Sequence, residues 1–119
     1  MQFLRSVLAI AALVGAAFCL SGGSAEGQST TTNRLTVYLL RGRMHSGQQT
    51  HWGAAACSWN YPVGTQLRLP DGWVVTCLDR GLLGSRGWID IWAPDGQTGR
   101  AIQARYGNWT QATVVRWGW

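Results

Sequence analysis

The sequence predicts a small, mainly β domain, built as a compact barrel with one short helix. Short runs of β-branched, aromatic and aliphatic residues alternate with turn residues, and glycine is frequent, at 16 of 119 positions. Only one segment has a convincing helical pattern. Without a leader of 25 residues, roughly 94 residues remain, which is enough for one small core. We therefore expect a single domain.

The N-terminal segment has the pattern of a secretory leader. Arg5 supplies a positive charge, residues 7–20 form an unbroken apolar run (VLAIAALVGAAFCL), and small residues follow at 23–25. We therefore expect a signal peptide over residues 1–25, cleaved after Ala25. The protein is expected to be secreted, or periplasmic and associated with the cell wall.

The same segment argues against a permanent membrane anchor. Its apolar run is shorter than the ~20 residues that span a bilayer, so no stable membrane insertion of the mature chain is expected. A lipoprotein anchor at Cys19 is the competing possibility. It is disfavoured because the preceding Phe18 is bulky where that processing site needs a small residue.

Six segments beyond a polar linker (residues 26–34) have strand composition, within a domain expected over residues 35–119. The predicted strands are residues 35–40, 54–57, 65–69, 73–78, 88–92 and 109–117. The turn Pro70-Asp71-Gly72 suggests that the third and fourth strands form a hairpin. Residues 41–53 are predicted to form a long loop.

Residues 97–106 (QTGRAIQARY) are predicted to form the single helix. Asp95 is a candidate cap for the first turn, and Gly107 is a candidate end signal. Ala101, Ile102 and Tyr106 are expected to line one face.

Cys57 and Cys77 are the two cysteines beyond the leader. In an exported protein such a pair most often forms a disulfide, which would close a loop of roughly 20 residues and contribute about 3 kcal/mol. Two buried free thiols are the alternative. His45 and His51 have no ligand spacing with either cysteine, so neither a metal site nor a cofactor is expected.

The charge of the chain is one-sided. It has ten arginines, no lysine and five acidic residues, which gives a net charge of +5. An excess of arginine on an exported domain suits an anionic partner such as a cell-wall polymer. The arginines are scattered along the chain instead of clustered, which disfavours a nucleic-acid binder.

Asp79 and Asp90 are the candidate catalytic residues. The other acids lie at the edge of the leader or in turns. Asp79 ends an apolar strand, where burial would raise its pKa as a general acid requires. Asp90 lies between two isoleucines of a strand and faces away from both. Two carboxylates held close together push their pKa values apart, so one stays protonated while the other is ionised.

Five motifs around these aspartates resemble a known family. In order they are Ser46-Gly47-Gln48, Gly53-Ala54-Ala55-Ala56, Pro62-Val63-Gly64-Thr65, Asp79-Arg80-Gly81 and Ile89-Asp90. From about Leu35 to Trp117 the chain resembles rare-lipoprotein-A-like domains and the three-aspartate domain of membrane-bound lytic transglycosylase A. The resemblance implies a six-stranded double-psi β-barrel.

The resemblance also implies an activity on peptidoglycan. Lytic transglycosylases cleave its glycan without water and leave a 1,6-anhydro sugar. By position, Asp79 would be the acid/base and Asp90 would tune or orient it. The chain departs from both families: Cys57 stands where the three-aspartate pattern has an aspartate, and Ser58 where the rare-lipoprotein-A pattern has a histidine. Either aspartate could instead be structural, because an aspartate beside a glycine-rich loop often binds backbone amides or a nearby arginine, here Arg80 or Arg86.

The chain has eight tryptophans, and core filling is the ordinary role for each. Trp52 and Trp59 lie in loops, where their faces could stack on sugar rings. Together with Arg80 and Arg86 they are the candidate substrate-binding residues. A non-catalytic, expansin-like module that binds cell-wall polysaccharide is therefore the alternative function. In either case we expect a monomer.

Overall fold

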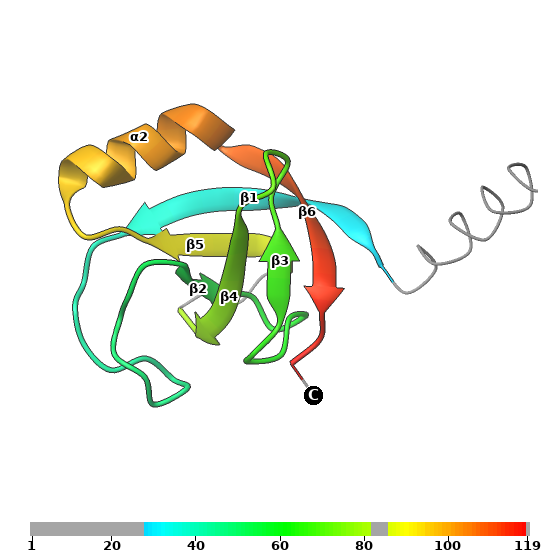
Figure 1. The fold of residues 1–119 in the computed structure, drawn as a ribbon, viewed down its shortest axis with the longest axis horizontal. Coiled ribbons are helices and arrows are strands. Elements are labelled where there is room, and N and C mark those ends of the chain that lie inside the picture. Colours follow the sequence, from blue (N-terminus) through cyan, green and yellow to red (C-terminus); the bar gives the residue numbers. More distant parts are fainter. Residues whose placement is uncertain (1–27, 82–85, 119) are drawn as a thin grey trace, which may run out of the picture.

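The computed structural model describes residues 28–81 and 86–118 (Figure 1). The predicted signal peptide and its cleavage site lie outside the described residues. No helix in the described ranges is long and apolar enough to cross a membrane.

Six strands and one helix make up the described part of the chain, as the sequence predicts. They are β1 (Thr30–Tyr38), β2 (Ala54–Cys57), β3 (Gln66–Arg68), β4 (Val74–Asp79), β5 (Trp88–Trp92), α2 (Gly96–Tyr106) and β6 (Trp109–Arg116). The bounds of β2 and β5 match their predictions. β1 begins five residues earlier than predicted and takes in most of the predicted linker, because that stretch pairs with β6.

The strands form one mixed sheet that closes on itself. Its order is β1-β5-β2-β4-β3-β6, and β6 pairs with β1 to complete a closed barrel (Figure 1). The pairs β1–β5 and β2–β4 are parallel, and the other four pairs are antiparallel. The β3–β4 pair is the hairpin that the sequence predicts around Pro70-Asp71-Gly72.

The pairing pattern has an internal two-fold symmetry. Exchanging β1, β2 and β3 for β4, β5 and β6 turns the parallel pair β1–β5 into the parallel pair β4–β2. The same exchange turns the antiparallel pair β1–β6 into β4–β3, and it leaves β2–β5 and β3–β6 unchanged. The two halves of the barrel therefore have the same connectivity.

The core lies inside the barrel and consists of inward-facing alternate residues of the strands. Leu35, Leu67, Val75, Ile89 and Ile91 are each at most 1% exposed. The predicted disulfide is confirmed. It joins β2 to β4 across 5.5 Å between the Cα atoms of its cysteines, and both cysteines are buried in this core.

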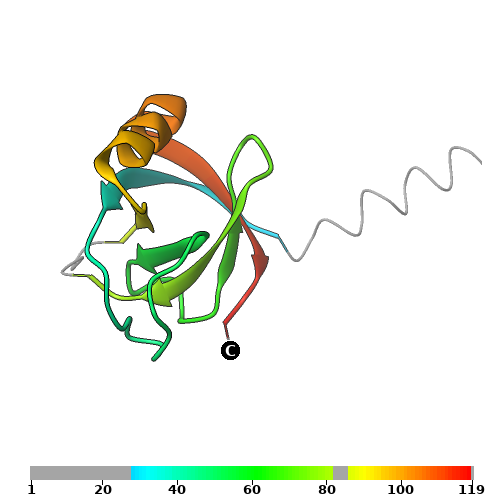
Figure 2. The same cartoon turned by 60° about the vertical axis from the view of Figure 1, so that its left-hand side comes forward.

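The helix α2 packs against the outside of β1, and Figures 1 and 2 both show it above the sheet. The side chain of Asp95 accepts a hydrogen bond from the N–H of Thr98 at 2.7 Å, and Gly107 ends the helix with a φ of 75°. Gly99 allows close packing, because a Cβ there would lie 3.1 Å from the side chain of Val37. Ile102 is buried as predicted.

We expect Leu67→Ala to lower the free energy of unfolding by about 2–5 kcal/mol, because Leu67 is fully buried in β3 and its loss leaves a cavity. Urea denaturation followed by circular dichroism measures this change. Leu40→Ala is the matched control: Leu40 is 80% exposed, so the expected change is under about 0.5 kcal/mol. Equal losses in the two variants would contradict the prediction.

Candidate functional site

The two candidate aspartates belong to one row of residues across four neighbouring strands. Ala56 of β2 pairs with Asp79 of β4 on one side and with Asp90 of β5 on the other, and Asp90 pairs in turn with Thr36 of β1. Directly paired residues point to the same face of a sheet. Both carboxylates therefore project from the outer face, separated by the small Ala56. Two strand spacings place their Cα atoms about 9–10 Å apart.

A β-bulge gives Asp79 its orientation. The register shifts between Ala55 and Ala56, so that Ala55 pairs with Cys77 and Ala56 with Asp79, and Leu78 is the extra residue. Strict alternation after Cys77, which faces the core, would turn Asp79 inward. The bulge instead keeps its carboxylate on the outer face beside Asp90.

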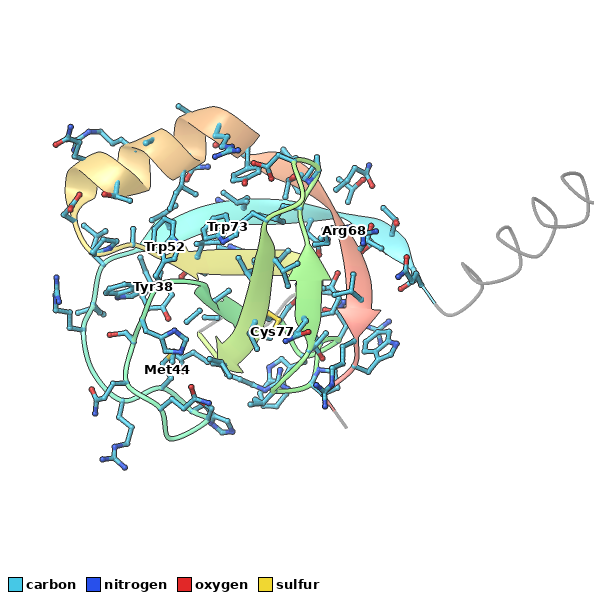
Figure 3. All side chains as sticks on the ribbon, in the orientation of Figure 1. Tyr38, Met44, Trp52, Arg68, Trp73 and Cys77 are labelled. Carbon is cyan, nitrogen blue, oxygen red and sulfur yellow. A yellow bond between two sulfur atoms is a disulfide. The ribbon has the colours of Figure 1, made fainter. Side chains whose placement is uncertain are left out.

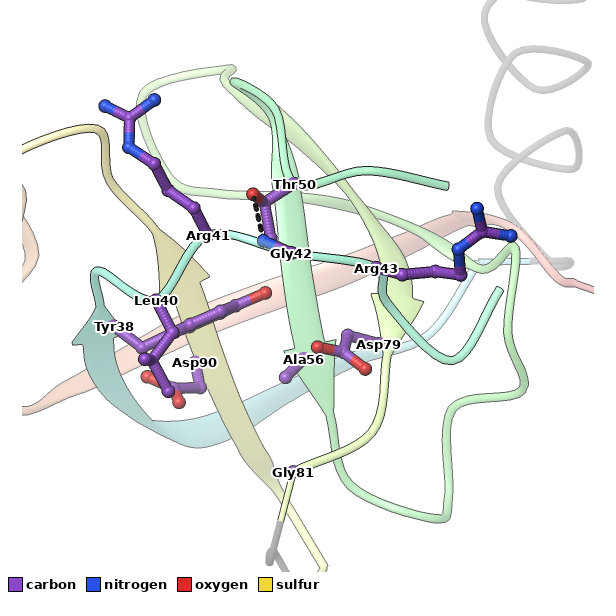
Figure 4. Close-up of a pocket in the computed structure, with 10 residues that line it drawn as sticks. All are labelled: Tyr38, Leu40, Arg41, Gly42, Arg43, Thr50, Ala56, Asp79, Gly81 and Asp90. Atoms are coloured by element: carbon purple, nitrogen blue, oxygen red, sulfur yellow. Dashed lines mark hydrogen bonds between the residues drawn. The ribbon is translucent and has the colours of Figure 1, made fainter. Parts of the chain in front are cut away.

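A cavity of about 530 Å³ lies over this row, between the sheet and the loop of residues 39–53 (Figure 4). Its lining residues are Tyr38, Leu40, Arg41, Gly42, Arg43, Thr50, Ala56, Asp79, Gly81 and Asp90. Figure 4 shows Ala56 between the two aspartates, and it shows Arg41 and Arg43 pointing outward from the loop. The cavity is therefore open to a ligand and has both carboxylates at its base.

Contacts with β4 hold the loop of residues 39–53 in place. Met44 is buried in a small cluster with Ala54 and Leu78. The N–H of Ser46 donates to the carbonyl oxygen of Leu78 at 2.9 Å. The N–H of His45 donates to Asp79 Oδ1, also at 2.9 Å. The bulge residue and the aspartate that follows it thus anchor the loop that covers the site.

The two carboxylates have different surroundings. Asp79 Oδ1 accepts hydrogen bonds from the N–H groups of His45 and Arg80, each at 2.9 Å, and these bonds fix the orientation of the carboxylate. Asp90 Oδ1 accepts one from the hydroxyl of Thr36 at 2.8 Å. Burial raises the pKa of Asp90, and the negative charge of Asp79 raises it further, against the opposing effect of the Thr36 hydrogen bond.

Tyr38 is a third polar group at the site, and the sequence does not single it out. Its hydroxyl oxygen is buried and has no hydrogen-bond partner among the described residues. It lies close enough to Asp79 to be affected by its charge, but without the geometry of a hydrogen bond. Burial, followed by the charges of Asp79 and Asp90, raises the pKa of Tyr38, so its hydroxyl stays protonated. Figure 4 shows it reaching into the space between the two aspartates.

We expect Asp90→Asn to raise the melting temperature at pH 7. Folding raises the pKa of Asp90, so its contribution to stability is fully present below the pKa of the unfolded chain and is lost as pH rises through the folded pKa. Asparagine is neutral at every pH and can still accept the Thr36 hydrogen bond, so it avoids this loss. Calorimetry at pH 3 and pH 7 tests the prediction, and a difference that is the same at both pH values would contradict it.

The predicted arginine partners do not pair with the aspartates. The guanidinium of Arg80 lies over the ring of Trp59, 4.6 Å from the ring centroid, and donates to the carbonyl oxygen of Ser58 at 3.2 Å. Arg86 is exposed, and within the described ranges it forms no ion pair with Asp79 or Asp90. Neither aspartate therefore has an arginine side chain as a partner, but Asp79 does bind two backbone N–H groups, which is the other structural role expected from the sequence.

The two predicted tryptophans do not share a surface. Trp59 is 69% exposed and contacts Arg80, whereas Trp52 is 55% exposed and stacks on Trp73 (Figure 3). They lie beyond opposite ends of β2 and have different partners. Of these two tryptophans, Trp52 belongs to the loop of residues 39–53, which covers the aspartate cavity.

The two positions that depart from the family patterns are part of the scaffold. Cys57 is in the disulfide on the core side of β2. Ser58 is buried, donates its hydroxyl hydrogen to Asn60 Oδ1 at 2.7 Å, and accepts the N–H of Trp88 at 3.0 Å. Neither side chain lines the cavity, so both brace the strands beneath it.

Comparison with known proteins found no matching family model, no similar curated protein and no similar solved structure. Within residues 28–81 and 86–118, no three histidine, cysteine or acidic side chains gather where they could hold a metal ion.

Proposed function

We propose that this protein cleaves the glycan of peptidoglycan by lytic transglycosylation, with Asp90 as the acid/base. The observation that supports this most directly is the pair of carboxylates facing one open cavity, of which Asp90 has a raised pKa. A general acid must keep its proton until the substrate is bound, and a raised pKa serves that need. This assignment differs from that implied by the family resemblance, in which Asp79 is the acid/base.

The reaction needs one proton donor that later becomes a base. Asp90 gives its proton to the glycosidic oxygen, the C1–O bond breaks, and the leaving sugar keeps the proton. The C6 hydroxyl of the cleaved sugar then attacks its own C1, and the hydroxyl proton passes to Asp90. The product is a 1,6-anhydro sugar, no water is consumed, and Asp90 ends in the protonated form in which it began.

Asp79 and Tyr38 have supporting roles in this scheme. Positive charge develops at C1 as the bond breaks, and the carboxylate of Asp79, fixed by two backbone N–H groups, stabilises it. The hydroxyl of Tyr38 is buried beside the two aspartates and stays protonated, so it can donate to either carboxylate as its charge changes during the reaction. Tyr38 contributes a polar side chain to the lining of the cavity, whereas Cys57 and Ser58 do not line the cavity.

The proposal includes the fold and the location of the protein. The two-fold symmetry of the strand pairing supports a double-psi β-barrel, in which two interlocked motifs are related in this way. The disulfide supports export, because such bonds persist in oxidising compartments. The net charge of +5 suits a wall polymer that carries carboxylates.

Digestion of purified peptidoglycan tests the proposed activity. We expect muropeptides with 1,6-anhydro ends, identified by mass spectrometry from their lack of one water relative to reducing ends. Products with reducing ends would contradict the lyase mechanism and indicate hydrolysis. Sedimentation of the protein with peptidoglycan but without any products would contradict the enzyme and favour the expansin-like binding module.

A further inference from the structure

Three aromatic rings form a stack outside the aspartate cavity. The ring centroids of Trp52 and Trp73 are 5.0 Å apart with an interplanar angle of 22°, and those of Trp73 and Tyr106 are 6.2 Å apart at 23°. The rings come from the β1–β2 loop, the β3–β4 hairpin and the end of α2. Figure 3 shows Trp52 and Trp73 next to each other. We call these three residues the aromatic stack.

The inner end of the aromatic stack is fixed in place. The hydroxyl of Tyr106 donates to the carboxylate of Asp71, at 2.8 Å from each oxygen, and Arg105 forms an ion pair with the same carboxylate. Trp73 and Tyr106 both pack against the main core cluster. These two rings therefore have a structural role that accounts for their presence.

Trp52 has no such role. It is the outermost ring, it is 55% exposed, and it does not belong to the buried core cluster. A large apolar ring held on a fixed neighbour loses little conformational entropy when a ligand covers it. Trp52 is thus arranged as a binding surface, at a position that the core does not require.

A groove of about 420 Å³ runs between the aromatic stack and α2. Its lining residues are Trp52, Trp73, Thr98, Ala101, Ile102, Arg105 and Tyr106. One wall is aromatic, whereas the helix wall includes the polar residues Thr98 and Arg105. Sugars need this combination, because a pyranose has an apolar C–H face and a rim of hydroxyl groups.

We propose that the groove beside Trp52 is a second subsite for the glycan chain, in which a sugar ring lies on the indole of Trp52. The site rests on the proposed function, because its ligand is the chain that is cleaved at the aspartates. Thr50 lines the aspartate cavity and Trp52 lines the groove. Trp52 and Ala56 are four positions apart in the chain, so their Cα atoms are at most about 14 Å apart. A short oligosaccharide spans that distance.

The charges at the groove favour a sugar over a nucleotide. A nucleic acid would also stack a base on an exposed indole, but it needs cations nearby for its phosphates. Arg105 lines the groove, and its charge is balanced by Asp71 in their ion pair. This leaves no excess positive charge on the groove wall, which suits a ligand that presents hydroxyl and acetamido groups there.

Titration with a soluble β-1,4-linked N-acetylglucosamine oligomer tests the subsite. The protein carries Asp90→Asn so that the oligomer is not cleaved, and isothermal calorimetry gives the affinity. We expect Trp52→Ala to weaken binding at least about 10-fold and Trp52→Phe to restore most of it, because phenylalanine keeps an aromatic face. Trp109→Ala is the matched control, since Trp109 is 64% exposed at the start of β6 and lines neither cavity; its affinity is expected to be unchanged.

Unchanged affinity in Trp52→Ala would overturn the subsite, as would an equal loss in Trp109→Ala. A Trp52-dependent change in sedimentation coefficient would also overturn it, by showing that a second copy covers the groove. The outcomes for the two proposals are separable. Trp52-dependent binding with no cleavage by the wild type would support the subsite and refute the lyase. Cleavage by the wild type, with binding that does not depend on Trp52, would support the lyase and refute the subsite.

Discussion

Asp90→Asn is expected to reduce the release of 1,6-anhydro muropeptides by about 10²–10⁴-fold, the range typical of the loss of a general acid. Asparagine preserves the shape of the side chain and its acceptor for the Thr36 hydroxyl, so the row of residues across the sheet should stay intact. The loss is therefore chemical, not structural. Initial rates on purified peptidoglycan measure it, and circular dichroism confirms that the variant is folded.

Two further variants make the assignment of the acid decisive. Asp79→Asn is expected to cause a smaller loss, because Asp79 stabilises charge without transferring a proton. Asp95→Asn is the matched control, since asparagine caps a helix as well as aspartate does and Asp95 lies outside the cavity. Full activity in Asp90→Asn together with none in Asp79→Asn would reverse the two roles.

The wild-type rate should also fall as pH rises through the pKa of Asp90, which burial has raised.

Removal of the disulfide is expected to have the second large effect. The loop between Cys57 and Cys77 has a sequence separation of 20, so Cys57→Ala/Cys77→Ala should lower the free energy of unfolding by about 3 kcal/mol. Activity should fall as well at temperatures where the variant is still folded. Cys57 directly follows Ala56, and Cys77 lies two residues before Asp79, so the bridge braces the strands that carry the site.

Urea titration with and without a reducing agent measures the effect of the disulfide. The reductant should destabilise the wild type to about the level of the double variant, and it should leave the double variant itself unchanged. A wild type that is equally stable in both conditions would contradict the prediction. Comparison of initial rates in the reduced and oxidised wild type separates the bracing of the site from global stability.

Local sequence patterns predict the elements that depend on local physics. β5 follows from the alternation of Ile89, Asp90 and Ile91, and the capping of α2 follows from Asp95. The start of β1 is different. Its first residues are polar and exposed, and they become a strand through pairing with β6, some 80 residues later in the chain. Pairing at that distance leaves no local signal.

The candidate site also combines features that the local sequence predicts with features that depend on the fold. The sequence singles out Asp79 and Asp90 by their residue type, but it does not reveal that both pair with Ala56. That arrangement depends on the bulge at Leu78, and nothing in the run of residues 74–78 distinguishes a bulged strand from a regular one. The sequence does not predict a role for Tyr38, because only the fold places its hydroxyl beside the aspartates. Trp52 is recognisable as an aromatic loop residue, whereas its stacking on Trp73 depends on tertiary structure.

The two-fold symmetry of the strand pairing has a consequence for how the chain folds. Each of the six strand pairs joins a strand from the first half to one from the second, so neither half has a strand pair of its own in the described part of the chain. A half-folded barrel would leave every strand edge open. Only the β3–β4 hairpin closes over a short distance, and the other pairings must pay the entropy of long loops, which slows folding. The barrel therefore forms as one cooperative unit, and the Cys57–Cys77 bond links its two halves covalently.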